Sequence, residues 1–348
     1  MYKRQELLWA GTELGLYASH DRGGTWRRLH LKNLPTVSIH DVLVHPREND
    51  LILGTHGRAI WVFDDATPLQ EFDPAVDGQD NLLFNMRRAF RYPSRFTRYG
   101  LGDRRHKAPN PPSGALITYY LSEDLEDGEN GEESELSANV EAPTASSDET
   151  TQERLKVEIL DSGGEVIRTL DGETLGRAKG LHRVAWDLAM DGARQRTDEK
   201  PEVSEFSGPP RGPWVLPGTY TVRLTVDDEV LEAPVEVGVD PSVDVSLEDL
   251  QTQFRVVESL QEKLSVLNDG LRRIDAVSAQ LEARRATARH MQQDIPEDLL
   301  DALKEYEEGV ADLLDRLARA DDKPFWSQGP RLSERLRSLA REIDGQFA

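Results

Sequence analysis

The chain contains no cysteine among its 348 residues, which excludes disulfides and thiolate metal sites and leaves the redox compartment open. It also lacks an apolar run of about 18 residues, so we expect no membrane span. Residues 1–5 lead into a predicted strand without the apolar core of a secretory signal. The compartment therefore stays undetermined, and an extracytoplasmic location is compatible with the sequence.

Lysine is also scarce, since only nine of the 42 basic residues are lysine, whereas 64 residues are acidic and the net charge is −22. Residues 123–153 carry twelve acidic side chains and no Lys or Arg, so the rest of the chain has a net charge of −10. This composition resembles that of proteins from halophilic archaea, whose acidic surfaces stay soluble in salt. Because phosphate contacts need clustered Lys and Arg, we expect no nucleic-acid partner.

The most specific local motif is a tight turn with the pattern Ser-x-Asp-x-Gly-x-Thr-Trp. It consists of Ser19, Asp21, Gly23, Thr25 and Trp26. We expect Asp21 to accept hydrogen bonds from the turn, Gly23 to supply an unusual backbone angle, and Trp26 to pack between sheets. The pattern resembles the Asp-box of sialidase-like and sortilin-like β-propellers. It indicates a structural hairpin and not a catalytic group.

Part of this hairpin recurs 43 residues later, where Gly54-Thr55-His56 corresponds to Gly11-Thr12-Glu13. Blades of four-stranded propellers repeat at about 40–50 residues, so we interpret residues 1–65 as partial β-propeller blades. An Asp-box this early in the sequence predicts that the chain is the C-terminal part of a longer propeller protein.

Residues 66–111 are predicted to be a basic clasp or linker. Within residues 81–107, eight Lys or Arg side chains accompany a single acid, Asp103, and aromatic residues are interleaved with them. A nucleic-acid-binding arm has this composition, but no base-stacking fold accompanies it. We therefore favour a segment that wraps the propeller surface.

Residues 112–240 are predicted to form a β-sandwich that resembles an immunoglobulin-like module. The alternating segments separated by turns are residues 115–121, 155–160, 165–170, 180–187, 217–226 and 230–239. The acidic residues 123–153 lie between two of these strands, and we interpret them as a solvated surface insertion.

Residues 241–348 are predicted to be helical. Ser246 and Asp249 form a capping box, and apolar residues at a spacing of three and four continue as far as Leu281. Two further helices are expected near residues 296–320 and 331–343. The pattern indicates an antiparallel helical hairpin with a third short helix. A dimerising coiled coil is the alternative, but a hairpin that packs on its own third helix needs no partner, so oligomerisation is not favoured.

The order of these segments resembles the C-terminal half of sortilin-like, Asp-box propeller proteins of bacteria and archaea, which are often labelled glycosyl hydrolases. The matching residues are 11–21, 44–51, 54–58 and 110–121. The resemblance implies a multidomain fold, mainly β and then α.

A glycosidase needs two carboxylates about 5–9.5 Å apart on either side of the scissile bond. Glu13 and Asp41 are weak candidates for this pair, because they lie in strand-like segments of the repeat. His56 and Arg58 are ligand-binding candidates at the same channel face. The alternative, which we favour, is that Glu13 and Arg58 form an ion pair between neighbouring blades.

His40, His45 and His56 raise the question of a metal site. His40 and His45 are five residues apart on a predicted strand, so their side chains point to opposite faces. We expect no metal and no cofactor. The sequence also contains no Gly-x-Ser-x-Gly elbow and no phosphate-binding loop.

Two functions follow from these patterns. The first is a non-catalytic scaffold whose propeller binds a protein, a peptide or a glycan. The alternative is a glycoside hydrolase with most of its active site in N-terminal blades that precede this sequence.

Overall fold

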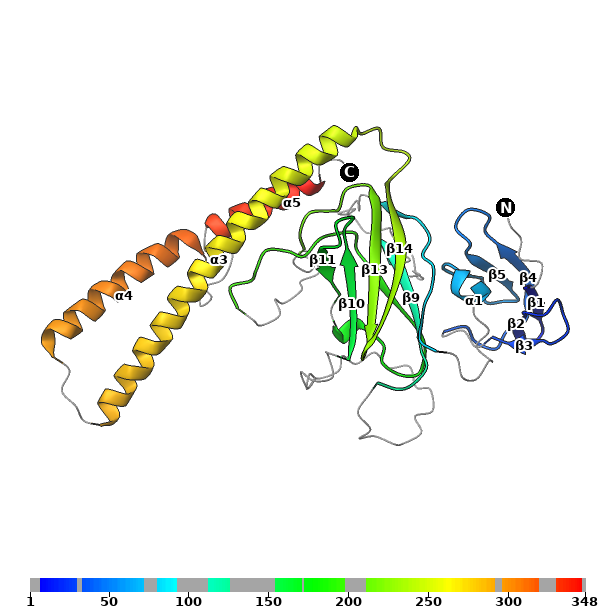
Figure 1. Cartoon of the computed structure of the whole chain (residues 1–348), viewed down its shortest axis with the longest axis horizontal. Helices are drawn as coiled ribbons and strands as arrows, with labels where there is room; N and C mark the ends of the chain where they lie inside the picture. The colour runs from blue at the N-terminus through cyan, green and yellow to red at the C-terminus, as the bar shows by residue number, and fades with distance from the viewer. Residues whose placement is uncertain are drawn as a thin grey trace. The chain divides into compact units, whose positions relative to one another are not determined.

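The computed structural model is a mixed β and α protein with several sheets and a helical C-terminal region (Figure 1). The residues that it describes are 7–29, 33–71, 80–92, 112–125, 154–170, 172–197, 211–291, 296–318 and 330–345. Most of the acidic insertion 123–153, residues 93–111 of the clasp and part of the link between the second and third helices lie outside them. Among the described residues, no helix is both long and apolar enough to cross a membrane.

The chain divides into two compact units. The first contains residues 1–91, 98–187 and 217–239, and the second contains residues 92–97, 188–216 and 240–348. Residues 188–216, which the sequence analysis places in the sandwich, thus group with the helices.

Two three-stranded antiparallel sheets occupy residues 8–63 of the first unit. One consists of β1 (Leu8–Thr12), β2 (Gly15–Ser19) and β3 (Arg27–Arg28), and the other of β4 (Ile39–Val44), β5 (Leu51–Thr55) and β6 (Ile60–Phe63). The short helix α1 (Thr67–Glu71) follows. Their shared core is made of Leu16, Ile39, Leu51, Leu53 and Ala66. The two copies of the repeat end equivalent strands, β1 and β5.

Two further sheets complete the first unit. A five-stranded sheet has the order β11 (Val166–Thr169), β10 (Leu155–Leu160), β13 (Gly218–Val226), β14 (Glu229–Val239) and β8 (Ala89–Arg91). A three-stranded sheet has the order β12 (Gly180–Trp186), β9 (Ala115–Leu121) and β7 (Leu82–Leu83), and a short 3-10 helix, η1, spans Gly172–Thr174. The ring of Trp186 packs edge-on against Tyr220, with centroids 5.6 Å apart, so the two sheets share a core.

The strands expected within residues 115–239 are therefore present. The clasp differs from expectation, because its residues 82–83 and 89–91 are edge strands of these two sheets. Strands of two and three residues are too short to show a period of two in the sequence.

The second unit is built on α3 (Leu247–His290), with α4 (Glu297–Leu317) and α5 (Leu332–Gly345). The capping box is confirmed, since the amide of Asp249 donates to Ser246 Oγ at 3.1 Å and that hydroxyl donates to Asp249 Oδ2 at 2.6 Å. Helix α5 packs on the first half of α3, where Gln253 Nε2 donates to the carbonyl of Ile343 at 2.6 Å. The three expected helices are confirmed within a few residues at each end.

Candidate functional site

The carboxylate of Asp21 holds the turn between β2 and β3 together. Ser19 Oγ donates to Asp21 Oδ1, and the amide and hydroxyl of Thr25 donate to Oδ1 and Oδ2, each at 2.8 Å. The amide of Gly23 donates to Ser19 Oγ at 2.7 Å. These bonds lower the pKa of Asp21 to about 2, and the largest cause is the Thr25 amide. Asp21 is therefore the anion around which the turn forms.

For the rest of the motif, the expectation for Gly23 is confirmed and the expectation for Trp26 is wrong. Gly23 has φ +94°, in the region that favours glycine, as predicted. A side chain at Gly24 would lie 2.9 Å from Asp21 Oδ2, so the turn needs both glycines. The prediction for Trp26 is wrong, because its side chain is 43% exposed. Trp26 precedes an edge strand of only two residues, so no second sheet covers it.

In two hairpin turns a threonine hydroxyl donates a hydrogen bond to a backbone carbonyl across the turn. The hydroxyl of Thr12 donates to the carbonyl of Gly15 at 2.9 Å, and the hydroxyl of Thr55 donates to that of Ala59 at 2.6 Å. These bonds close the β1–β2 turn and the β5–β6 turn. The two turns differ in length, since the Thr12 hydroxyl reaches three residues ahead and the Thr55 hydroxyl reaches four, so the repeat preserves the threonine and the strand before it but not the turn itself.

The turns present the candidate residues at one end of the two sheets. Gly11, near the end of β1, lies against the backbone of Ile39, and Ile39 pairs with Thr55 at the end of β5. Both turns therefore lie near the start of β4. The residues placed at this end are Glu13, Asp41, His56 and Arg58, all of them exposed. Exposure and shared position suit contact with a ligand.

At this end of the sheets, two histidine rings lie close together. The rings of His40 and His56 lie 5.1 Å apart, and the amide of His56 donates to the carbonyl of Ser38 at 2.9 Å. Asp41 lies beside Gly54, after an irregularity in the β4–β5 register. The bulge explains why the sequence analysis did not place His40 beside His56, because a regular period of two does not allow for it.

The expected ion pair between Glu13 and Arg58 does not form. Among the described residues, no ion pair joins these two side chains, both of which are exposed at the tips of separate turns. Their charges are therefore available at the surface.

A metal centre is not built at this end. The described residues contain no group of three or more His, Asp or Glu side chains that could hold a metal ion. His45 lies instead in the β4–β5 turn, where its Nδ1 accepts a hydrogen bond from the amide of Glu48 at 3.1 Å. His45, which was expected on the same strand as His40, follows the end of β4 at Val44 and belongs to the turn.

Arg183, a partly buried arginine of the first unit, lies among groups whose pKa values are shifted. Its guanidinium donates to the carbonyls of Asp64 at 2.6 Å and Asp65 at 3.0 Å, and to Thr118 Oγ1 at 3.0 Å. Burial lowers the pKa of Arg183 and raises the pKa of Asp64. The guanidinium also lies over the ring of Phe63, 5.2 Å from its centroid. Backbone carbonyls fill the fork of this arginine, so the cluster is structural.

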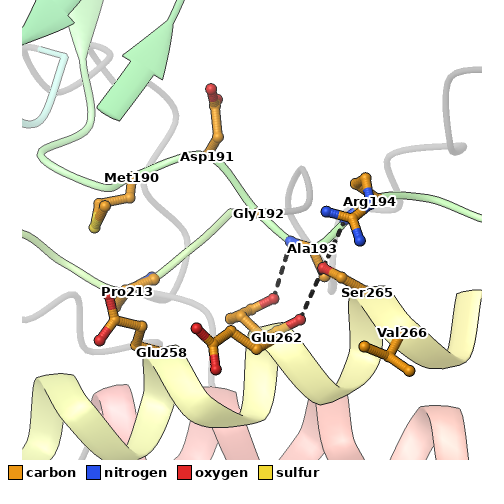
Figure 2. Close-up of a pocket in the computed structure, with 11 residues that line it drawn as sticks. Met190, Asp191, Gly192, Ala193, Arg194, Pro213, Glu258, Glu262, Ser265 and Val266 are labelled. Carbon is orange, nitrogen blue, oxygen red and sulfur yellow. Dashed lines mark hydrogen bonds between the residues drawn. The ribbon is translucent and has the colours of Figure 1, made fainter. Parts of the chain in front are cut away.

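The second unit contains a pocket that the sequence analysis missed. It has a volume of about 490 Å³ and lies where residues 190–194 and Pro213 cross α3 (Figure 2). The acidic side chains at its rim are Asp191, Glu258 and Glu262. Glu258 and Glu262 extend from the helix, whereas Asp191 points away from it (Figure 2).

Hydrogen bonds to α3 account for the shape of this pocket. The amide of Ala193 donates to Gln261 Oε1 at 3.0 Å, and the amide of Arg194 donates to Ser265 Oγ at 3.2 Å. A side chain at Gly212 would overlap the carbonyl of Asp191, so this approach requires glycine. Glycines at 192 and 212 were the only signal in the sequence, and they did not point to a helix 50 residues away.

Comparison with models of known protein families, with curated proteins and with solved structures finds no match.

Proposed function

We propose that the sheets of residues 8–63 are blades of an Asp-box β-propeller and that the sheets of residues 82–239 form an immunoglobulin-like sandwich. On this proposal the protein is a scaffold whose blades bind a protein, a peptide or a glycan. The 43-residue offset supports it, because strands that end in Gly-Thr and enter a hairpin with a threonine hydrogen bond recur at the spacing of propeller blades.

One observation carries the binding function, namely that the β1–β2 and β5–β6 turns present exposed side chains of both charges at a shared end. Glu13 and Arg58 are not paired with each other, so binding a ligand does not require breaking a bond between them. The hydrogen bonds of Thr12 and Thr55 fix the turns in advance, which reduces the entropy lost on binding.

The alternative is hydrolysis of a glycosidic bond by Glu13 and Asp41. Their position at one end of the sheets favours it, but both carboxylates are exposed to water. A general acid usually needs an apolar or charged environment that keeps it protonated near neutral pH. Binding is therefore the better supported function.

The experiment is a screen of the fluorescently labelled full chain against arrays of glycans and peptides. We expect Glu13→Ala and Arg58→Ala each to weaken binding to a ligand so identified by about tenfold, which corresponds to 1.4 kcal/mol. The matched control is Arg47→Ala, since Arg47 lies in the β4–β5 turn, at the other end of these strands. Equal loss in all three variants would contradict the assignment of this surface.

Release of reducing sugar from polysaccharides distinguishes the alternative. Turnover that disappears in both Glu13→Ala and Asp41→Ala would establish hydrolysis and overturn the non-catalytic proposal. Binding without turnover supports the scaffold.

A further inference from the structure

The distal part of the helical unit has an apolar surface that no described residue of the chain covers. On α3 the buried apolar residues are Leu250, Val257, Leu264 and Leu271. From residue 272 to the end of α3, no described side chain is buried. Helix α5 packs on the first half of α3. The chain just before α5 approaches the C-terminal end of α4, where Arg331 pairs with Asp315 at 2.7 Å. The third helix therefore does not cover the rest of the hairpin.

Helix α4 carries two adjacent apolar rows, and neither is buried. Leu303, Val310 and Leu317 recur every seven residues and are half-buried, as expected of a row that faces α3. The second row, at the same period, is Leu299, Tyr306 and Leu313. In this row Leu299 is 50% and Leu313 is 38% exposed. An apolar stripe of this width needs more than one neighbouring helix.

The distal part of α3 presents a matching surface. Ile274, Leu281 and Ala288 are half-buried at a period of seven, and Val277 beside them is 44% exposed. Helix α4 runs back along α3 (Figure 1), and Arg285 pairs with Glu307 between them. Two helices of about 20 residues are about 30 Å long and enclose no core of their own.

The charges of the two helices indicate what covers them. Residues 297–317 have a net charge of −6, and residues 272–290 have a net charge of +3, counting histidine as neutral. When two such hairpins meet about a two-fold axis with α4 against α3, each acidic helix gains a basic neighbour from the other copy. One hairpin thus presents both halves of a complementary pair, which favours a second copy over an unrelated partner.

We propose that residues 272–290 and 297–317 are a dimerisation surface, on which α4 of one copy packs against the distal part of α3 of another to form an antiparallel four-helix bundle. The row Leu299, Tyr306 and Leu313, in which Tyr306 is half-buried and both leucines are exposed, forms part of the shared core. The second copy supplies the cover that α5 gives to the first half of α3.

The test is the mass of the full chain by light scattering and sedimentation. We expect a dimer at about 100 μM. The double variant Leu299→Asp/Leu313→Asp should shift the dimer-to-monomer midpoint at least about a hundredfold higher in concentration, because both carboxylates would be buried in the bundle. The matched control is Val230→Asp on β14, whose side chain is equally exposed and which should remain dimeric. A monomeric natural chain, or a double variant that dimerises normally, would overturn the proposal.

A second measurement does not depend on weakening the dimer. Because the chain has no cysteine, a spin label on Gly309→Cys gives one label per copy, and any dipolar coupling must join two copies. A side chain at Gly309 meets no atom, so the substitution leaves the fold intact. We expect a coupling that disappears on dilution with unlabelled protein. Its absence in a dimeric sample would place the interface elsewhere and reject this surface.

Discussion

The guanidinium of Arg183 on β12 donates a hydrogen bond of 2.6 Å to the backbone carbonyl of Asp64, which directly follows β6. The two residues are 119 positions apart in the sequence. Through this contact, a strand of the β12–β9–β7 sheet fixes the end of the β4–β5–β6 sheet within the first unit. The contact uses a charged donor and a neutral carbonyl, so it needs no acidic partner to form.

Replacing Arg183 by Met should destabilise the first unit by roughly 2–4 kcal/mol, because the buried carbonyls of Asp64 and Asp65 lose charge-assisted hydrogen bonds. Urea unfolding followed by tryptophan fluorescence measures this change. The matched control is Arg223→Met, which removes an exposed pair with Glu232 and should cost less than about 1 kcal/mol. Equal losses in the two variants would show that the carbonyl contacts contribute nothing.

Asp64 and Asp65 should respond oppositely to substitution. Burial raises the pKa of Asp64 in the folded protein above its usual 3.8. The contribution of Asp64 to stability therefore falls as pH rises from 3.8 to this higher pKa of the folded protein. Asp64→Asn should therefore stabilise the protein at neutral pH, and the gain should vanish below pH 3.8. Asp65→Ala should destabilise it by about 1 kcal/mol, because Asp65 Oδ1 accepts hydrogen bonds from the amide and hydroxyl of Thr67 at the start of α1. Chemical denaturation between pH 3 and pH 7 distinguishes these outcomes.

The turn around Asp21 should show the reverse pH dependence. The pKa of Asp21 is lowered from 3.8 to about 2, so its stabilisation is complete above pH 3.8 and is lost as pH falls towards 2. Asp21→Asn should be less stable than the natural chain at pH 6, and the difference should shrink between pH 4 and pH 2. Thr25→Val keeps the backbone donor and should retain most of this pH dependence. A constant difference for Asp21→Asn across the range would contradict the assigned role.

Substitutions at two glycines compare a clash with the backbone and a clash with a side chain. A side chain at Gly114 would overlap the carbonyl oxygen of Trp186, and φ at Gly114 is +105°. Gly114→Ala should therefore cost more than about 3 kcal/mol or prevent folding of the first unit. A side chain at Gly176 would meet the ring of His182, which can turn aside, so Gly176→Ala should cost about 1–2 kcal/mol. Thermal unfolding of both variants tests the order.

Along α3, the cost of truncating an apolar side chain should depend on position. Leu271→Ala removes a residue that is 1% exposed and should cost about 2–5 kcal/mol. Leu281→Ala, which lies further along α3, should cost about half as much in a monomer, since Leu281 is only half-buried. Unfolding at low protein concentration measures this difference, and a larger loss at high concentration is expected from the proposed dimer.

Short-range features were the most predictable. The pattern around Asp21 predicted its hydrogen-bonded turn because every partner lies within four residues of it. The capping box at Ser246 and the helices were predictable for the same reason, since a helix depends on a local period. The environment of Trp26 was not predictable, because its burial depends on whether another sheet lies beside a two-residue strand.

The candidate surface was predictable only in part. Glu13 was expected within a strand of the repeat but lies in the β1–β2 turn, and whether it touches Arg58 depends on the separation of two turns, which the repeat does not specify. His40 beside His56 depends on a bulge in β4. The pocket over α3 depends on contacts between residues 193–194 and 261–265, for which no local pattern exists.

The sequence by itself determined the strands within residues 115–239, the three long helices, the hydrogen-bonded turn around Asp21, the acidic charge and the absence of disulfides, because these depend on composition or on neighbours along the chain. Only the tertiary structure decided which surfaces are covered. It directed Arg183 to the carbonyls of Asp64 and Asp65, and it placed α5 on the first half of α3 alone. The reason is that burial is set by contacts between distant segments, and a side chain's own neighbours in sequence do not specify them.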